Sequence, residues 1–253
     1  MDPIVMVHGA FVGGWSFERF RAPFEAAGHR VLTPDLRGHG AREPSDAVVG
    51  VSIRDYANDV AALCASLPSR PILIGHSMGG LVAQLAARRV KPRAVVLLAP
   101  SPPWGLVGWN VEEALTAFGA QFVSLLSNGA VEPSAEVMRT VTLNRMTRAE
   151  AAPILARLRR ESARAVRETL NWWLDPFMTS SIGSGPLRAR SLVISGEADQ
   201  VHPPASGRLV AERIGGEFLC LPEMSHWLPG EPGWEDVAEA ALEFIGREAR
   251  AAA

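Results

Sequence analysis

The 253-residue chain has 25 basic and 27 acidic side chains, a formal net charge of -2 and 47% hydrophobic residues. This composition is ordinary for a folded globular protein and excludes a disordered or fibrous chain. Because no basic excess is present to neutralise phosphates, nucleic acid is not expected as a partner.

The cysteines and the apolar runs bear on compartment and membrane contact. Cys64 and Cys220 are the only cysteines and are not spaced as a metal-binding pair, so we expect reduced thiols and a cytoplasmic location. No apolar run approaches the roughly 20 residues that span a bilayer, and the segment Met1–Val7 lacks the features of a signal peptide. We therefore expect no membrane contact, and the sequence leaves a homodimer open.

Short apolar runs alternate with longer segments of helical periodicity. The runs lack polar alternation, which indicates strands buried on both faces, as in a parallel sheet between helices. The expected strands are Ile4–Val7, Val31–Thr33, Ile72–Ile74, Ala94–Leu98, Leu192–Ile194 and Phe218–Leu221. The expected helices are Ser52–Leu67 (with Ser52 and Asp55 as a capping pair), Leu81–Val90, Ala205–Ile214 and Pro232–Arg250. This order predicts an α/β fold with a doubly wound, mostly parallel, six-stranded sheet.

The alternation stops between about Ser101 and Arg190, where the chain is expected to be helical throughout. Its clearest helical segments are Glu112–Leu126 and Glu150–Leu174. An insertion between two parallel strands lies above their carboxyl ends, where ligands bind in open α/β sheets. We therefore predict a core formed by residues 1–100 and 186–253, and a helical cap or lid formed by residues 101–185 after the fourth strand.

The most informative segment is Gly75-His76-Ser77-Met78-Gly79, which joins an expected strand to an expected helix. A turn this sharp forces its central residue into a strained conformation and brings the positions two before and two after it close together. Glycines at both positions avoid a collision of side chains. The serine hydroxyl is then lifted clear of the sheet, at a helix N-terminus that favours negative charge.

Two other interpretations of this turn compete. A glycine-rich turn can cradle a dinucleotide pyrophosphate, but that site needs an acidic residue after the next strand, which ends Leu98-Ala99-Pro100. A turn without catalysis is compatible with the pentapeptide alone. The acid and the base found further along the chain favour the catalytic interpretation.

A serine nucleophile needs a base that is itself oriented by a carboxylate. In this architecture the acid and then the histidine follow the serine, each just after a strand. Asp199 follows the fifth expected strand and His226 follows the sixth, with Glu197 as the alternative carboxylate. The sequence therefore predicts a catalytic triad of Ser77, Asp199 and His226.

The loop after the first strand, which begins at His8, lies where acyl transfer requires a second oxyanion donor. We expect the backbone N–H groups of Met78 and Ala10 to form the oxyanion hole, with Phe11 as the neighbouring alternative to Ala10. The Gly13-Gly14 pair allows this loop close backbone approach.

The remaining histidines are weaker candidates for chemistry. His8 is expected to tie the strand end to the loop, and His76 either lines the pocket or has a structural role. His29, His39 and His202 are expected at the surface or in loops. Their scatter, and the lack of closely spaced carboxylates or thiols, argues against a metal site, so no cofactor is expected.

Together these residues resemble the α/β-hydrolase superfamily over nearly the whole chain. The matching landmarks, in chain order, are His8-Gly9, Asp35–Gly40, the Gly75–Gly79 elbow, Asp199 and His226. The chain begins directly with the first parallel strand, and the loop His8–Trp15 is similar to that of the compact branch containing methyl esterases and hydroxynitrile lyases. Lyases of that branch use a threonine directly after the histidine and a pocket lysine. Here Gly9 takes that position and Lys91 is the only lysine, so the resemblance implies a hydrolase.

Aromatic side chains are concentrated in the predicted cap and favour an apolar acyl or alkoxy group in the substrate. The alternative is that they only pack the cap against the core. The predicted substrate-binding residues are Phe11, His76, Trp104, Trp172 and Trp227. We expect a serine hydrolase that cleaves carboxylic esters of small or medium apolar substrates through an acyl-enzyme. The alternatives are a carbon–carbon bond, lactone or thioester hydrolase with the same triad, and a weakly catalytic small-molecule receptor.

Overall fold

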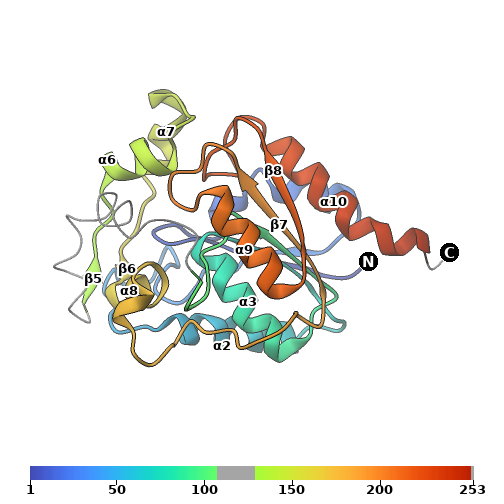
Figure 1. Cartoon of the computed structure of the whole chain (residues 1–253). Helices are drawn as coiled ribbons and strands as arrows, with labels where there is room; N and C mark the ends of the chain where they lie inside the picture. The colour runs from blue at the N-terminus through green and yellow to red at the C-terminus, as the bar shows by residue number, and fades with distance from the viewer. Residues whose placement is uncertain (107–128, 252–253) are drawn as a thin grey trace.

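A six-stranded parallel sheet forms the centre of the computed structural model, which describes residues 1–106 and 129–251 (Figure 1). The strand order is β2-β1-β3-β4-β7-β8, and every pairing in this sheet is parallel. The strands are β1 (Ile4–Val7), β2 (Val31–Leu32), β3 (Ile72–His76), β4 (Ala94–Leu98), β7 (Arg190–Gly196) and β8 (Glu217–Leu221). The predicted doubly wound sheet is confirmed, and no strand end differs from its expected position by more than two residues.

Helices cover both faces of this sheet (Figure 1). One face packs against α2 (Ile53–Ala65), α3 (Met78–Val90) and α9 (Pro204–Ile214). The other face packs against α1 (Arg21–Ala26) and α10 (Trp234–Ala251). Among the residues that the structure describes, no helix has both the length and the apolar character needed to cross a bilayer.

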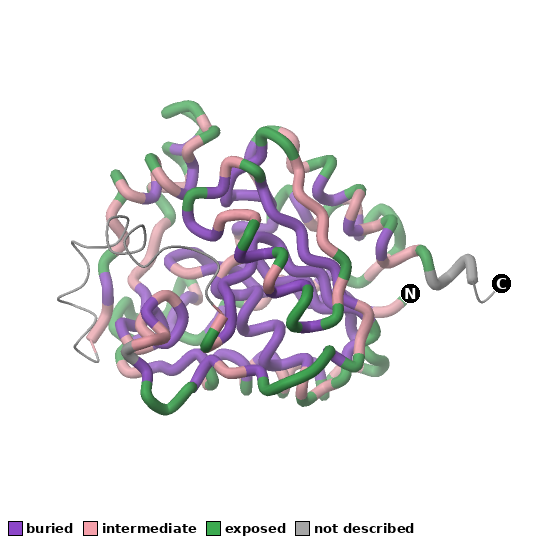
Figure 2. Tube along the Cα trace, viewed as in Figure 1, coloured by how far each residue is buried: buried purple, intermediate pink, exposed green. Residues whose placement is uncertain are grey.

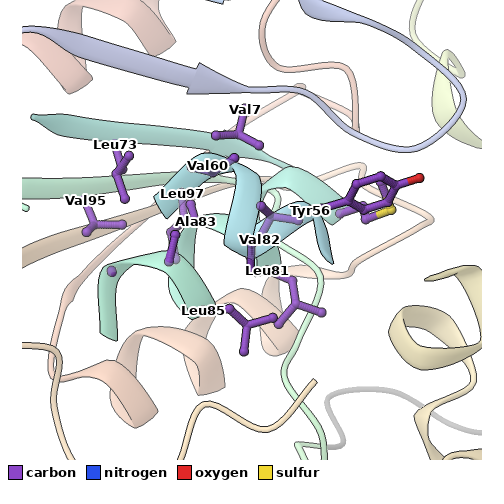
Figure 3. Close-up of a cluster of buried hydrophobic side chains, with 14 of the residues drawn as sticks. Val7, Tyr56, Val60, Leu73, Leu81, Val82, Ala83, Leu85, Val95 and Leu97 are labelled. Carbon is purple, nitrogen blue, oxygen red and sulfur yellow. The ribbon is translucent and has the colours of Figure 1, made fainter. Parts of the chain in front are cut away.

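Neighbouring strand residues contribute alternately to the two cores. Val7, Leu73 and Leu97 point towards α2 and α3 (Figure 3), whereas Met6 and Ile74 pack on the opposite side with α1 and α10. The inner strands β1, β3, β4 and β7 are consequently buried along nearly their whole length, as the purple centre of Figure 2 shows, whereas the edge strands β2 and β8 are partly exposed. This two-sided burial explains why the strands read as continuous apolar runs in the sequence.

The start of α2 has the cap that the sequence predicts. The Ser52 hydroxyl accepts a hydrogen bond from the Arg54 N–H at 3.2 Å, and the Asp55 carboxylate accepts one from the Ser52 N–H at 2.9 Å. Such reciprocal caps satisfy backbone donors that have no partner within the helix. They stabilise the first turn of α2.

Between β4 and β7 the chain forms an insertion rather than a further layer (Figure 1). Its described elements are β5 (Ala130–Val131), α6 (Ala135–Val137), the π-helical turn η3 (Met138–Thr142), α7 (Arg148–Leu155), β6 (Glu161–Ser162), α8 (Ala163–Leu170) and the 3-10 turn η4 (Trp172–Leu174). A further 3-10 turn, η1 (Gly14–Phe17), follows β1. The expected helix Glu112–Leu126 lies outside the described residues.

The expectation of one continuous helix over Glu150–Leu174 is wrong. The segment divides into α7 and α8, and β6 between them pairs antiparallel with β5. The break occurs where Glu161 is fully buried and accepts a hydrogen bond from the Tyr56 hydroxyl at 2.6 Å, while His39 Nε2 lies 3.0 Å from its other oxygen. These partners belong to the core, so a long-range polar contact overrides the local helical periodicity.

A second carboxylate of the insertion holds the start of α2. Glu168 Oε2 accepts hydrogen bonds from the Ser52 hydroxyl at 2.7 Å and from the Ile53 N–H at 2.9 Å. Its other oxygen accepts one from Arg164 Nε at 2.8 Å, and the side chain is 4% exposed. A negative charge at a helix N-terminus is favourable, so Glu168 links the insertion to the core through both charge and hydrogen bonding.

We expect Glu168→Gln to lower the free energy of unfolding by about 2 kcal/mol, because the charged acceptor of two buried donors and of the half-exposed Arg164 becomes a neutral amide. Urea denaturation measures the change. Glu25→Gln is the matched control, since Arg21 and Glu25 form the same i,i+4 pair on the surface, with the Glu25 side chain 42% exposed. That variant is expected to change stability by less than about 0.5 kcal/mol. If both variants lost the same free energy of unfolding, the contact between Glu168 and the start of α2 would contribute nothing to stability.

Candidate active site

Ser77 lies in the sharp turn between β3 and α3, with φ 54° and ψ -124°. Backbone in this region costs about 1–3 kcal/mol and persists only where the surroundings impose it. The chain passes so closely that a Cβ on Gly75 would lie 2.4 Å from the Gly79 carbonyl oxygen, and one on Gly79 would lie 2.2 Å from that of Val7. The turn presents the serine hydroxyl at the N-terminus of α3, as the sequence predicts.

The structure brings Ser77, His226 and Asp199 together at the carboxyl edge of the sheet. Nε2 of His226 lies 2.9 Å from the Ser77 hydroxyl oxygen, and Nδ1 of His226 lies 2.9 Å from Asp199 Oδ2. Because an ionised carboxylate only accepts, Nδ1 carries the proton and donates it to Asp199. The neutral Nε2 is then the acceptor of the serine hydroxyl, which is the arrangement that nucleophilic catalysis by serine requires.

Asp199 is held in its ionised form by its surroundings. Burial alone raises the pKa of this carboxyl, but the neighbouring His226 and the hydrogen bonds outweigh that effect, and the pKa lies below its ordinary value. Its Oδ1 accepts hydrogen bonds from the Val201 N–H at 2.8 Å and the His202 N–H at 2.9 Å. Both oxygens therefore have fixed partners, which orients the carboxylate towards the imidazole.

The loop that carries His226 is anchored by a buried carboxylate that the sequence analysis did not identify. Glu231 is fully buried and accepts hydrogen bonds from the backbone N–H of Ser225, at 2.8 Å, and from its hydroxyl. Burial raises the pKa of Glu231 above its ordinary value. On the other side of the loop, Nε2 of His76 donates to the His226 carbonyl oxygen at 2.8 Å.

The first loop, which carries the expected oxyanion donor, is also fixed from two sides. His8 donates from Nδ1 to the Gly9 carbonyl oxygen at 2.8 Å, and its Nε2 accepts from the Leu36 N–H at 2.9 Å. Phe11 has φ 65°, and its carbonyl oxygen accepts the Arg159 N–H of the insertion at 2.8 Å. His8 thus ties the strand end to the loop, as predicted.

Ser77 lines a small cavity of about 60 Å³, which the insertion covers. Both expected oxyanion donors, Ala10 and Met78, line this cavity. The Met78 N–H lies at the first position of α3, where no helical acceptor precedes it. The other described lining residues are Gly9, Phe11, Val12, His76, Ser101, Met138, Thr142, Val166, Thr169, Leu170, Val201, His226 and Trp227.

The predicted substrate-binding residues divide into two groups. Phe11, His76 and Trp227 line the cavity, and the His76 ring lies edge-on to Trp227 with centroids 5.7 Å apart. Trp104 and Trp172 are not among the described lining residues. They pack edge-to-face with centroids 5.4 Å apart, and Trp104 Nε1 donates to the Asp175 carbonyl oxygen at 3.1 Å.

Several residues of the site were not identified from the sequence. His39 and His202 lie in loops, which is one of the two expected placements, and both are buried. Ser101 and Thr169 line the cavity although neither belongs to a motif. The only signal for Thr169 is its place beside Val166 and Leu170 on one face of α8, because helical spacing groups these positions.

Three histidines near the site are buried and uncharged. Burial is the largest cause that lowers the pKa of His8, His76 and His202, each to about 3, and neighbouring histidines lower it further. In the unfolded chain each returns to an ordinary value of about 6.5. Between these values the unfolded state binds more protons than the folded state, so acid favours unfolding.

We therefore expect these three histidines to remove about 4 kcal/mol from the free energy of unfolding between pH 7.5 and pH 5.5. The sign follows from the lowered folded-state pKa: their effect is negligible well above pH 6.5 and grows as the pH falls. Urea denaturation across this range measures the slope. His8→Gln keeps a donor and an acceptor at this position and should remove about one third of the pH dependence. A free energy of unfolding that stays constant between pH 7.5 and pH 5.5 in the wild type would contradict the lowered pKa values of the three histidines.

Over residues 1–106 and 129–251, no group of three His, Cys, Asp or Glu side chains is placed to hold a metal ion.

Comparison with known proteins gives partial matches to curated esterases. The carbendazim hydrolyzing esterase of Nocardioides sp. is 38% identical over 94 residues, which cover 37% of this chain and 38% of that protein. The probable esterase PIR7A of Oryza sativa subsp. indica is 33% identical over 144 residues, covering 53% of this chain and 54% of that protein. The matches thus span from about two fifths to about half of the length of these relatives.

Fold and family comparisons cover nearly the whole chain. A methylesterase from Arabidopsis superimposes with a TM-score of 0.74 at 19% identity, over 97% of this chain and 99% of the other, which shows the same fold. The model of the alpha/beta hydrolase family matches residues 4–240. The sheet order, the serine elbow and this match agree, and the chain belongs to the alpha/beta hydrolase family.

Proposed function

We propose that the protein hydrolyses carboxylic esters of small or medium apolar substrates through an acyl-enzyme formed on Ser77. The observation that carries the proposal is the continuous hydrogen-bonded line from Ser77 through His226 to Asp199, with both links at 2.9 Å. The esterase names of the partial relatives support the same bond type.

In the first step His226 Nε2 accepts the proton of the Ser77 hydroxyl as the oxygen attacks the ester carbonyl. The imidazole becomes positively charged, and Asp199 stabilises that charge because it is ionised and hydrogen-bonded to Nδ1. The protonated His226 then donates to the departing alcohol oxygen, which leaves the acyl group bonded to Ser77.

The developing oxyanion requires donors that are fixed before the reaction begins. We assign this role to the N–H groups of Met78 and Ala10. The first is oriented by α3, and the second belongs to the loop that His8 and Arg159 hold in place. In the second step water attacks the acyl-enzyme, with His226 acting again as base and then as acid.

The described cavity favours small, uncharged substrates. Its volume is about 60 Å³, and no Asp, Glu, Lys or Arg is among its described lining residues. A carboxylate or ammonium group placed there would be buried without a charge partner, which is strongly unfavourable. The insertion covers this cavity through η3 and α8, and we retain the division into a core of residues 1–100 and 186–253 and a cap of residues 101–185.

The free thiols of Cys64 and Cys220 favour a reducing compartment, and we propose the cytoplasm on that basis.

A panel of p-nitrophenyl esters of increasing acyl length, together with a lactone, a thioester and a β-diketone, tests the proposed bond type. We expect kcat/KM to be highest for short acyl groups and to fall as the chain outgrows the cavity. Faster turnover of the lactone, thioester or diketone than of any p-nitrophenyl ester would show that the enzyme prefers that other bond type, and would overturn the proposed ester specificity. No turnover of any compound would favour a binding protein.

A further inference from the structure

Two hydroxyl-bearing residues outside the triad, Ser101 and Thr169, line the cavity among mainly apolar side chains. Ser101 follows β4, and Thr169 lies on α8 of the insertion. The side chains that surround them include Met138, Val166 and Leu170. Neither hydroxyl has a part in the ester chemistry proposed above, so a separate reason is needed for placing them there.

Ser101 is fully buried and is fixed beside the nucleophile. Its N–H donates to the Ser77 carbonyl oxygen at 3.0 Å, and its own carbonyl oxygen accepts from Gln84 Nε2 at 3.3 Å. Its hydroxyl oxygen lies 2.9 Å from Nε2 of His202. The backbone of Ser101 is therefore held in place, and only the direction of the hydroxyl hydrogen is left to settle.

The surroundings of His202 indicate that direction. Its ring is buried and neutral, with a pKa lowered to about 3 mainly by burial, while hydrogen bonding with the Val201 backbone acts to raise that pKa. Because a carbonyl oxygen only accepts, the proton belongs on the ring nitrogen that faces Val201, and Nε2 accepts the hydroxyl of Ser101. The hydroxyl hydrogen of Ser101 is therefore used within the protein, and it is not available to a ligand.

The hydroxyl group of Thr169 is in a different situation. The residue is 3% exposed, it lines the cavity, and its hydroxyl has no hydrogen-bond partner within residues 1–106 and 129–251. Leaving a buried hydroxyl unpaired costs about 1–3 kcal/mol. A group on a bound ligand recovers that cost, whereas an entirely hydrocarbon ligand does not.

We propose that the Thr169 hydroxyl forms a polar subsite that donates a hydrogen bond to a second, uncharged oxygen atom of the substrate beside the scissile ester. This inference rests on the ester hydrolase function proposed above. The oxygen is an ether, keto or hydroxyl oxygen, because the Thr169 hydroxyl is able to donate a hydrogen bond. It is not a carboxylate, because no arginine or lysine lines the described cavity.

The test compares esters that differ only by an oxygen in place of a methylene group. Ethyl methoxyacetate against ethyl butanoate places the oxygen in the acyl group, and 2-methoxyethyl acetate against butyl acetate places it in the alcohol. The ratio of kcat/KM within each pair is measured for the wild type, Ser101→Ala and Thr169→Val. Intrinsic reactivity is the same for every variant, so it cancels when the ratios are compared.

We expect Thr169→Val to lower the oxygen-to-methylene ratio by roughly threefold to tenfold for at least one pair, as for the loss of one hydrogen bond. Ser101→Ala should leave the ratios unchanged, because the Ser101 hydroxyl donates to His202. Thr142→Val is the matched control. Thr142 lines the same cavity, but its hydroxyl already lies 3.6 Å from Met138 Sδ as a donor, so the ratios should not change.

The outcomes separate the subsite from the proposed function. Unchanged ratios in Thr169→Val, or equal losses for both members of each pair, would overturn the subsite while ester hydrolysis stands. A wild-type protein that hydrolyses none of the four esters would overturn both. Thr169→Val removes no hydrogen bond among the described residues, so it should fold as the wild type does.

Discussion

Ser77→Ala is expected to lower kcat for an activated ester by about a thousandfold or more, because no other group can form the acyl-enzyme. Alanine keeps the Cβ of serine, so the strained turn, with its φ of 54°, should accept it without rearrangement. The residual rate would come from the oxyanion donors and the binding pocket alone. The measurement is the initial rate of p-nitrophenyl acetate hydrolysis at saturating substrate.

The folding of Ser77→Ala provides the control for this prediction. The far-ultraviolet circular dichroism and the urea midpoint of Ser77→Ala should match those of the wild type, because only one oxygen is removed. A variant that is folded and turns over at close to the wild-type rate would remove Ser77 from the mechanism.

Asp199→Asn is expected to lower kcat by about 10⁴-fold through a change of tautomer. The N–H groups of Val201 and His202 donate to Oδ1 at 2.8 and 2.9 Å, so the amide oxygen of an asparagine is held at that position. Its NH₂ group then faces Nδ1 of His226, which must become an acceptor. The imidazole proton moves to Nε2, and Nε2 can no longer accept the proton of Ser77.

Glu197→Gln is the matched control for this substitution. From the sequence, Glu197 is the alternative candidate for the carboxylate of the triad. Its side chain is exposed, whereas Asp199 is hydrogen-bonded to His226. We expect Glu197→Gln to keep kcat within about twofold of the wild type. A large loss in Glu197→Gln combined with a small loss in Asp199→Asn would exchange the roles of the two carboxylates.

The parallel sheet could be predicted because its signal is local. Strands such as Ile4–Val7 and Ala94–Leu98 are buried on both faces, so every position is apolar and the run is visible in the sequence. The meeting of Ser77, Asp199 and His226 was foreseeable for the same reason, since the carboxyl ends of parallel strands lie along one edge.

The errors arise where distant residues decide the structure. The break at Glu161 depends on Tyr56 and His39, which are more than a hundred residues away in the chain. His202 is buried and contacts Ser101, which lies 101 residues earlier in the chain and follows a different strand. No periodicity or motif contains such contacts, because they exist only when separate elements have packed together.

The aromatic residues of the insertion illustrate the same limit. Tryptophan is a residue type that often lines ligand pockets. Trp104 and Trp172 nevertheless pack against each other and are not among the lining residues of the described cavity. That cavity is instead lined by residues such as Val166 and Met138, which carry no chemical signal of their own. A pattern of residue types indicates that a surface is apolar but not which neighbour covers it.

Covalent labelling tests the central claim most directly. An organophosphate ester such as diethyl p-nitrophenyl phosphate should phosphorylate one residue stoichiometrically, and peptide mass spectrometry should assign the added group to Ser77. His226→Ala should label far more slowly, because the imidazole that accepts the serine proton is gone. Modification of a different residue, or equally fast labelling of the wild type and His226→Ala, would contradict the account.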